Sequence, residues 1–247
     1  MRRFGRWMIL ACCSLFTTFA VQQMRGEGVE VSGKILVNAP VKPAGKKHKD
    51  EPGAGNVVVW LSPLKPGTGA MLVAPARQPM YRLVQKDKMF TPHLLVVPTG
   101  SEVEFPNQDP FFHNVFSLFN GKRFDLGLYE SGTSRSVRFD REGISYIFCN
   151  IHPEMGAIVL ALNTPYYAVS DENGVVALHN VPAGNYRLNV WSENGQPANP
   201  ELSQRIVQVS NDPVHLGLIT IEATTDALAH HKNKFGRDYE PARERQY

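Results

Sequence analysis

The sequence contains little cysteine. Three cysteines occur among its 247 residues, and two of them, Cys12 and Cys13, lie within the first 20. If that N-terminal segment is removed, Cys149 is the single cysteine, so the chain has no pair from which to form an internal disulfide. A single cysteine in an exported protein is either a buried apolar side chain or a thiol that is kept for its chemistry.

The sequence also lacks an apolar run long enough for a membrane-spanning helix. The stretch Trp7–Ala20 has about 14 residues, against the roughly 20 that a helix needs to cross a bilayer. It follows Arg2, Arg3 and Arg6 and ends in a small residue, which is typical of a secretory signal peptide. We therefore predict that residues 1–20 are a signal peptide and that the mature protein is periplasmic or secreted, with no membrane span. An uncleaved anchor is the alternative.

An excess of charge is missing as well. The formal net charge is +3, and the three arginines of residues 1–20 account for it, which leaves 23 basic and 23 acidic residues in the remainder. Binding to nucleic acid requires a dense basic surface. The neutral remainder therefore argues against nucleic acid as a partner, although a local patch for a protein partner is compatible with it.

No stretch repeats apolar residues at the i, i+3, i+4, i+7 spacing of a long amphipathic helix. Short stretches rich in β-branched and aromatic residues recur instead, bounded by Gly, Pro, Asn or Asp, and this pattern predicts strands joined by turns. The predicted strands are Val29–Val37, Val57–Leu61, Leu94–Val97, Val103–Phe105, Ser136–Phe139, Ser145–Phe148, Ile158–Leu162, Val175–Leu178, Tyr186–Trp191, Gln204–Val209 and Gly217–Glu222. We therefore predict an all-β protein built from sandwiches.

The tail from Ala223 onward is highly charged and lacks a strand pattern. We expect this tail to be disordered or to form a peripheral helix. It contains the pair His230-His231, which offers two imidazoles for a metal ion. We expect both histidines to be solvated rather than to form a site.

The middle of the chain carries Cys149, His152 and Met155 in a C-x-x-H-x-x-M arrangement. A tight loop after a strand can bring three such side chains to one point, and His113 follows a second strand-like stretch. A copper ion that alternates between two oxidation states favours a soft thiolate, two imidazoles and a weak thioether. We therefore predict one mononuclear copper ion per chain, with the ligands His113, Cys149, His152 and Met155.

Each of these residues also has a simpler interpretation. Cys149 and Met155 can be core side chains, and His152 can be a surface residue. Their joint spacing, together with a second histidine after an Asn- and Pro-containing turn, favours the metal site. Zinc is a weaker candidate than copper, because a thioether is a poor zinc ligand.

The two motifs resemble those of the cupredoxins, the blue-copper proteins. The C-x-x-H-P-x-M loop is similar in length to that of the amicyanin type and shorter than in plastocyanin-like members. The resemblance covers residues 79–163 and implies a cupredoxin Greek-key β-sandwich with Met155 as axial ligand. It also implies that electrons pass through the exposed edge of His152. In this family the asparagine after the first histidine, here Asn114, hydrogen-bonds near the cysteine and steadies the two ligand loops.

The flanking segments resemble a second type of sandwich, called carboxypeptidase-regulatory-like or transthyretin-like. The resemblance rests on a strand with Gly33 and Ile35, the strand Val57–Leu61, the turn Asp171–Gly174 and the hairpin Val181–Val190. It predicts a discontinuous domain of residues 27–76 and 164–222, with the cupredoxin domain inserted, and a charged tail of residues 223–247. Two consecutive domains are the alternative. The whole chain also resembles exported proteins described as methylamine-utilisation-like.

Features that copper enzymes need are missing from the sequence. A binuclear electron-transfer centre needs a second bridging cysteine, and multicopper oxidases and copper nitrite reductases need further histidine clusters, often H-x-H. No acid–base carboxylate pair, nucleophile motif or phosphate loop stands out. We therefore expect a one-electron carrier rather than an enzyme, with a redox protein such as a c-type cytochrome or a dehydrogenase as partner. A copper-delivery protein, or a structural β-sandwich module stapled by its metal, is the alternative.

Overall fold

The computed structural model describes residues 28–38, 54–65, 79–118, 121–224 and 231–239. Within these ranges the chain forms eighteen β-strands and one short 3-10 helix, Pro200–Gln204. The predicted all-β class is therefore confirmed. No helix in the described part is long and apolar enough to cross a membrane. The predicted signal peptide, residues 1–20, lies outside the described residues.

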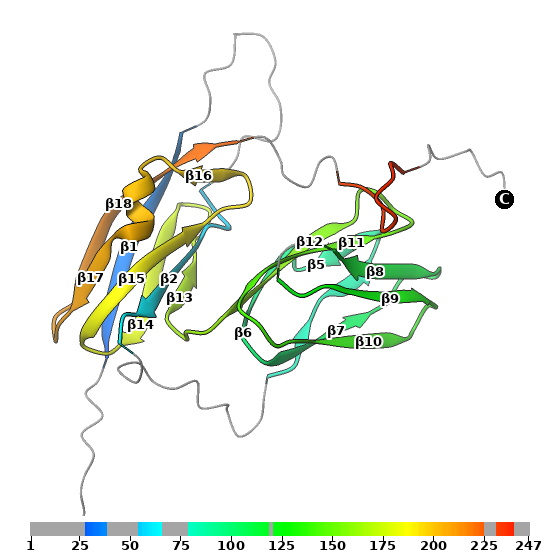
Figure 1. The fold of residues 1–247 in the computed structure, drawn as a ribbon, viewed down its shortest axis with the longest axis horizontal. Coiled ribbons are helices and arrows are strands. Elements are labelled where there is room, and N and C mark those ends of the chain that lie inside the picture. The colour runs from blue at the N-terminus through cyan, green and yellow to red at the C-terminus, as the bar shows by residue number, and fades with distance from the viewer. Residues whose placement is uncertain (1–27, 39–53, 66–78, 119–120, 225–230, 240–247) are drawn as a thin grey trace, which may run out of the picture.

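The middle of the chain forms one of two lobes (Figure 1). Its five-stranded sheet has the order β6-β12-β11-β8-β9, its three-stranded sheet has the order β10-β7-β3, and β4 and β5 form a hairpin. These strands are β3 (Tyr81–Arg82), β4 (Val84–Lys86), β5 (Met89–Thr91), β6 (Leu94–Pro98), β7 (Ser101–Pro106), β8 (His113–Ser117), β9 (Phe124–Tyr129), β10 (Ser134–Phe139), β11 (Gly143–Cys149) and β12 (Gly156–Leu162). Apolar side chains from both sheets share one core, which includes Phe105, Ile147 and Met155.

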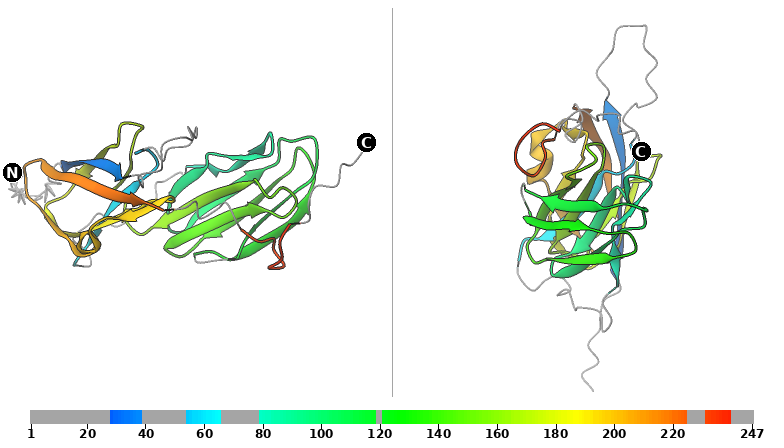
Figure 2. Two further views of the ribbon diagram at one scale, coloured as in Figure 1. Left: turned by 90° about the horizontal axis from the view of Figure 1, so that it is seen from above. Right: turned by 90° about the vertical axis from the view of Figure 1, so that its right-hand side faces the viewer.

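The other lobe combines strands from before and after the middle segment. Its two four-stranded sheets have the orders β14-β1-β18-β16 and β13-β2-β15-β17. The strands are β1 (Val29–Asn38), β2 (Val58–Pro63), β13 (Tyr167–Val169), β14 (Val175–Val181), β15 (Gly184–Trp191), β16 (Gly195–Pro197), β17 (Ile206–Val209) and β18 (Val214–Ala223). Strand β1 pairs with β14 and β18, and β2 pairs with β13 and β15. Figure 2 shows the two lobes arranged end to end.

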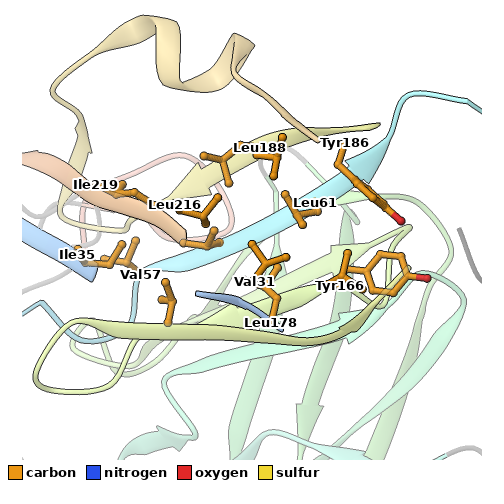
Figure 3. Close-up of a cluster of buried hydrophobic side chains, with 14 of the residues drawn as sticks. Val31, Ile35, Val57, Leu61, Tyr166, Leu178, Tyr186, Leu188, Leu216 and Ile219 are labelled. Carbon is orange, nitrogen blue, oxygen red and sulfur yellow. The ribbon is translucent and has the colours of Figure 1, made fainter. Parts of the chain in front are cut away.

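The core of this second lobe lies between its two sheets (Figure 3). Buried and exposed residues alternate along β15, where Tyr186 and Leu188 face the core and Arg187 faces solvent, because successive side chains of a strand point to opposite faces. Tyr186 packs edge-on against Tyr166 at a centroid distance of 5.8 Å, and its hydroxyl donates to the carbonyl oxygen of Pro182 at 2.9 Å. Each buried aliphatic side chain contributes about 1.5–3 kcal/mol to stability.

A third apolar cluster joins the two lobes. Val58 of β2 is buried together with Leu160 and Leu162 of β12, and Trp60 and Trp191 of the second lobe pack against them. His93 Nε2 and Glu193 Oε2 lie 2.7 Å apart across the same boundary. The lobes therefore share a packed interface rather than only a linker.

The structure differs from the sequence prediction in several places. His113 is the first residue of strand β8, and neither β8 nor β9 was among the predicted strands. All five residues of β8 are buried, so the strand has none of the alternation by which strands are recognised. The expectation of a disordered or helical tail is wrong for residues 231–239, which pack against the middle lobe.

Candidate metal centre

Two neighbouring strands bring the candidate ligands together. His113 begins β8 and Cys149 ends β11, and these strands pair so that Cys149 lies opposite Val115. His152 follows in the ligand loop, which we define as residues 149–155, between β11 and β12. The loop is closed by two backbone hydrogen bonds, from Cys149 N–H to the Met155 carbonyl at 3.2 Å and from Met155 N–H to the His152 carbonyl at 3.1 Å.

Three donor atoms converge at one end of the middle lobe. Cys149 Sγ lies 3.6 Å from His113 Nδ1 and 3.7 Å from His152 Nδ1, and the two Nδ1 atoms are 3.2 Å apart. A point equidistant from all three lies roughly 2.0 Å from each, close to the ~2.0–2.3 Å of metal–nitrogen and metal–thiolate bonds. Within the described residues, this is the group of His, Cys, Asp and Glu side chains that can hold a metal ion.

Met155, the predicted fourth ligand, ends the same loop. It is fully buried and belongs to the core of the middle lobe. Its backbone fixes the loop through both of the hydrogen bonds that close it. Met155 as an axial ligand stays a prediction.

The surroundings of Cys149 favour a thiolate. Burial alone raises the pKa of a thiol, but hydrogen bonds from His113 and from the backbone N–H groups of Asn114, Ile151 and His152 outweigh it and hold the pKa of Cys149 below its ordinary value. The thiolate is the form of cysteine that binds metals. The site is therefore prepared for a metal ion at its sulfur.

A buried carboxylate holds His113 from behind. His113 Nε2 lies 2.7 Å from Asp109 Oδ2, and the two side chains are 0% and 4% exposed. A carboxylate only accepts, so Nε2 carries the proton in this contact, and Nδ1 offers a lone pair to the centre of the site once it gives up the proton of its hydrogen bond to Cys149. Burial lowers the pKa of His113, but the neighbouring Cys149 and Asp109 raise it more, so its net pKa is above the ordinary value.

Asp109 is anchored in turn by the hairpin turn between β4 and β5. Its carboxylate accepts the backbone N–H groups of Asp87 at 2.6 Å and of Lys88 at 3.0 Å. Both turn residues have positive φ, 55° and 56°, a conformation that aspartate tolerates but that is unfavourable for Lys88. The carboxylate therefore stabilises an unfavourable turn and orients a ligand histidine at the same time.

Aromatic side chains border the more exposed histidine. The ring of Phe111 contacts both His113 and His152, at centroid distances of 5.2 and 5.5 Å. Phe112 and Ile151, which precede His113 and His152 in sequence, are 51% and 43% exposed. Burial, followed by the charge of His113, lowers the pKa of His152, which favours the neutral imidazole that binds metals.

Asn114 acts differently from the expectation. Its backbone N–H bonds the thiol of Cys149, as noted above, but its side-chain Nδ2 donates to Asp125 Oδ1 at 2.7 Å rather than steadying the cysteine directly. Asp125 Oδ2 in turn lies 2.8 Å from Lys234 Nζ. Asp109, Asp125 and Lys234 were not predicted from the sequence as residues of the site. Of the three, Asp109 alone could have been suspected from the sequence, because it lies four residues before the candidate ligand His113.

Comparisons with known proteins give partial similarities. No protein-family model and no curated protein matches the chain. A purple cupredoxin from Nitrosopumilus maritimus is 22% identical, with 33% of this chain and 99% of that chain covered and a TM-score of 0.31. Amicyanin from Paracoccus versutus is 18% identical, with 41% and 97% covered and a TM-score of 0.31. A copper-containing nitrite reductase from Thermus scotoductus is 22% identical, with 41% of this chain but 25% of that chain covered and a TM-score of 0.33.

Proposed function

We propose that this protein is a type 1 copper protein that carries one electron at a time between redox partners. The observation that supports this most is the convergence of a buried cysteine sulfur and two imidazole nitrogens within 3.7 Å of one another. His113, Cys149 and His152 would hold one copper ion, with Met155 as a weak axial ligand. When bound, copper supplies a one-electron couple at this end of the lobe.

The residues of the chain suit such a carrier. The hydrogen bonds around Cys149 lower the pKa of its thiol and favour the thiolate, and Asp109 holds the ring of His113, so the ligands would need little rearrangement between oxidation states. His152, which is half-buried and in ring contact with Phe111, offers an edge to a protein partner. We propose a redox protein as that partner, a periplasmic or secreted location, and a role without catalysis.

The flanking sandwich would be a separate, discontinuous domain. We propose that residues 79–163 are inserted between residues 27–76 and 164–222. The pairing of β1 and β2 with strands that follow the middle segment supports this arrangement. Its likeness to a carboxypeptidase-regulatory-like domain remains part of the same proposal.

The test is a Cu(II) titration of the protein followed by its visible absorption spectrum. We expect an intense thiolate-to-copper band that saturates at one copper per chain and is bleached by ascorbate. Cys149→Ser and His152→Asn should abolish or strongly weaken the band. His179→Asn, which changes an exposed histidine of the other lobe, is the matched control and should leave the band unchanged. Weak absorption without an intense band would exclude the type 1 site and favour a delivery or structural role.

A further inference from the structure

The C-terminal segment, residues 231–239, lies against the ligand loop although it is about 80–90 residues away in sequence (Figure 1). The hydroxyl of Tyr239 donates to the carbonyl oxygen of Cys149 at 2.8 Å. Lys234 N–H donates to Asn150 Oδ1 at 3.0 Å, and His231 Nε2 donates to the Pro153 carbonyl oxygen at 2.7 Å. The segment therefore contacts the first two residues of the ligand loop and Pro153 in its second half.

The segment has a defined conformation of its own. Asn233 Oδ1 accepts the N–H groups of Phe235 at 3.0 Å and Arg237 at 3.1 Å, and Asn233 N–H donates to the Arg237 carbonyl at 2.9 Å. Gly236 closes the turn with φ of 72°, a conformation that glycine adopts without strain. These bonds fix the direction of the Lys234 N–H that reaches Asn150.

Stacked rings attach the segment to the middle lobe. The imidazole of His231 stacks on Phe148, the residue before Cys149, with centroids 3.9 Å apart and planes inclined by 18°. The ring of Tyr239 meets His231 edge-on at 5.2 Å. Burial raises the pKa of Tyr239 above its ordinary value, so its hydroxyl keeps the proton that it donates to Cys149.

The same segment connects the two chain regions that carry the ligands. From the side of His113, Asn114 binds Asp125, and Asp125 binds the ammonium group of Lys234 at 2.8 Å. From the side of Cys149, the backbone of Lys234 binds Asn150. Lys234 therefore closes a chain of polar contacts between the residues that follow each ligand.

We propose that residues 231–239 are a C-terminal clamp that positions the ligand loop, with Tyr239 and Lys234 as its positioning residues. The clamp acts on Cys149 through the carbonyl oxygen of that residue and on the remainder of the loop through Asn150 and Pro153. The clamp restrains the ligand loop already in the metal-free chain. Its effect on bound copper rests on the proposed function.

Tyr239→Phe is the variant that tests this clamp, because it removes one hydroxyl and keeps the ring. In the metal-free protein, we expect the amides of Cys149 and Met155 to exchange hydrogen roughly two- to tenfold faster, as loss of one hydrogen bond predicts. Tyr186→Phe is the matched control: it removes a tyrosine–carbonyl bond in the other lobe and should leave both amides unchanged.

A chain that ends at Thr224 removes the whole clamp. We expect a larger acceleration at the same two amides, with exchange in strands β1 and β18 unchanged. In the copper-loaded protein, both variants should shift the thiolate-to-copper band and speed copper loss to a chelator. The clamp would be overturned if amide hydrogen exchange in the ligand loop of both variants equals that of the full chain. It would also be overturned if exchange accelerates equally in both lobes. If exchange in the ligand loop accelerates but the absorption band and the rate of copper loss stay unchanged, the clamp does not position the metal.

The two proposals fail separately. If the full chain gives no intense band with Cu(II), the proposed function is wrong. Exchange at Cys149 and Met155 in the metal-free variants still decides whether the clamp restrains the loop.

Discussion

The imidazole of His113 and the carboxylate of Asp109 are hydrogen-bonded at 2.7 Å and are both almost completely excluded from solvent. Burial raises the pKa of Asp109, but the hydrogen bonds from His113 and from the turn at Lys88 and Asp87 lower it further than burial raises it. The carboxylate therefore stays ionised inside the protein. A permanent negative charge lies directly behind one candidate ligand.

The first prediction concerns this charge. We expect Asp109→Asn to raise the reduction potential of the copper-loaded protein, because a buried anion favours the more positive, oxidised ion. In the metal-free protein, the pKa of His113 should fall, and stability should decrease by about 1–3 kcal/mol as a charged hydrogen bond is lost. Voltammetry, NMR titration and urea unfolding measure the three effects. An unchanged potential would contradict the role assigned to Asp109, with the exposed Asp212→Asn as control.

A second prediction concerns the axial position. We expect Met155→Leu to retain one copper ion and to raise the reduction potential, because a weak donor to Cu(II) is lost. Met155 is fully buried and leucine has nearly the same volume, so the stability cost should stay below about 1.5 kcal/mol. Voltammetry of the two proteins decides the matter, and a clear fall in potential would count against Met155 as a ligand.

The third prediction concerns acid. Partial burial raises the pKa of Asp125, but Lys234 and Asn114 lower it to a net value below the ordinary one. Its folded pKa therefore lies below the unfolded value of about 3.9, so the ion pair stabilises the protein above about pH 4 and this contribution is lost as the pH falls through the folded pKa. Because Asp125 is 40% exposed, we expect less than about 1 kcal/mol.

Urea unfolding of the wild type and of Asp125→Asn at several pH values checks the direction in which the stability contribution of Asp125 changes with pH. The wild type should be the more stable protein near pH 6, and the difference should shrink below about pH 3. A difference that grows towards acid would refute the predicted linkage.

The fourth prediction concerns the interface between the lobes. Leu162 of β12 is fully buried there, so Leu162→Ala should destabilise the protein by about 2–5 kcal/mol through lost burial and the cavity that remains. Leu218→Ala makes the same change at a side chain that is 65% exposed and should cost less than about 0.5 kcal/mol. Thermal and urea unfolding compare the two, and equal losses would show that the interface packing contributes little.

The sequence was sufficient to predict the all-β class and the grouping of His113, Cys149 and His152. Strand-forming stretches and turn residues are local signals, and Cys149 and His152 are close enough in sequence for one short loop to present both. The inclusion of His113 rested on the ligands that copper prefers and was supported by the resemblance to known metal sites, because nothing local places β8 beside β11.

The remaining features depend on contacts that no local pattern encodes. Strand β8 is buried on both faces, so its sequence lacks alternation. Residues 231–239 have no periodicity, and their place is set by distant partners such as Asn150 and Asp125. The backbone N–H of Asn114 contacts Cys149 as expected, but its side chain donates to Asp125. The position of Asp125 could not be predicted from the sequence.

Strand β12 begins at Gly156, next to Met155, and ends at Leu162, in the cluster that contains Trp60 and Trp191. Six residue steps of a β-strand span roughly 20 Å. The interface with the second lobe and the candidate metal centre therefore lie at opposite ends of strand β12. A protein that docks over His152 would therefore meet the middle lobe and residues 231–239 rather than the second lobe.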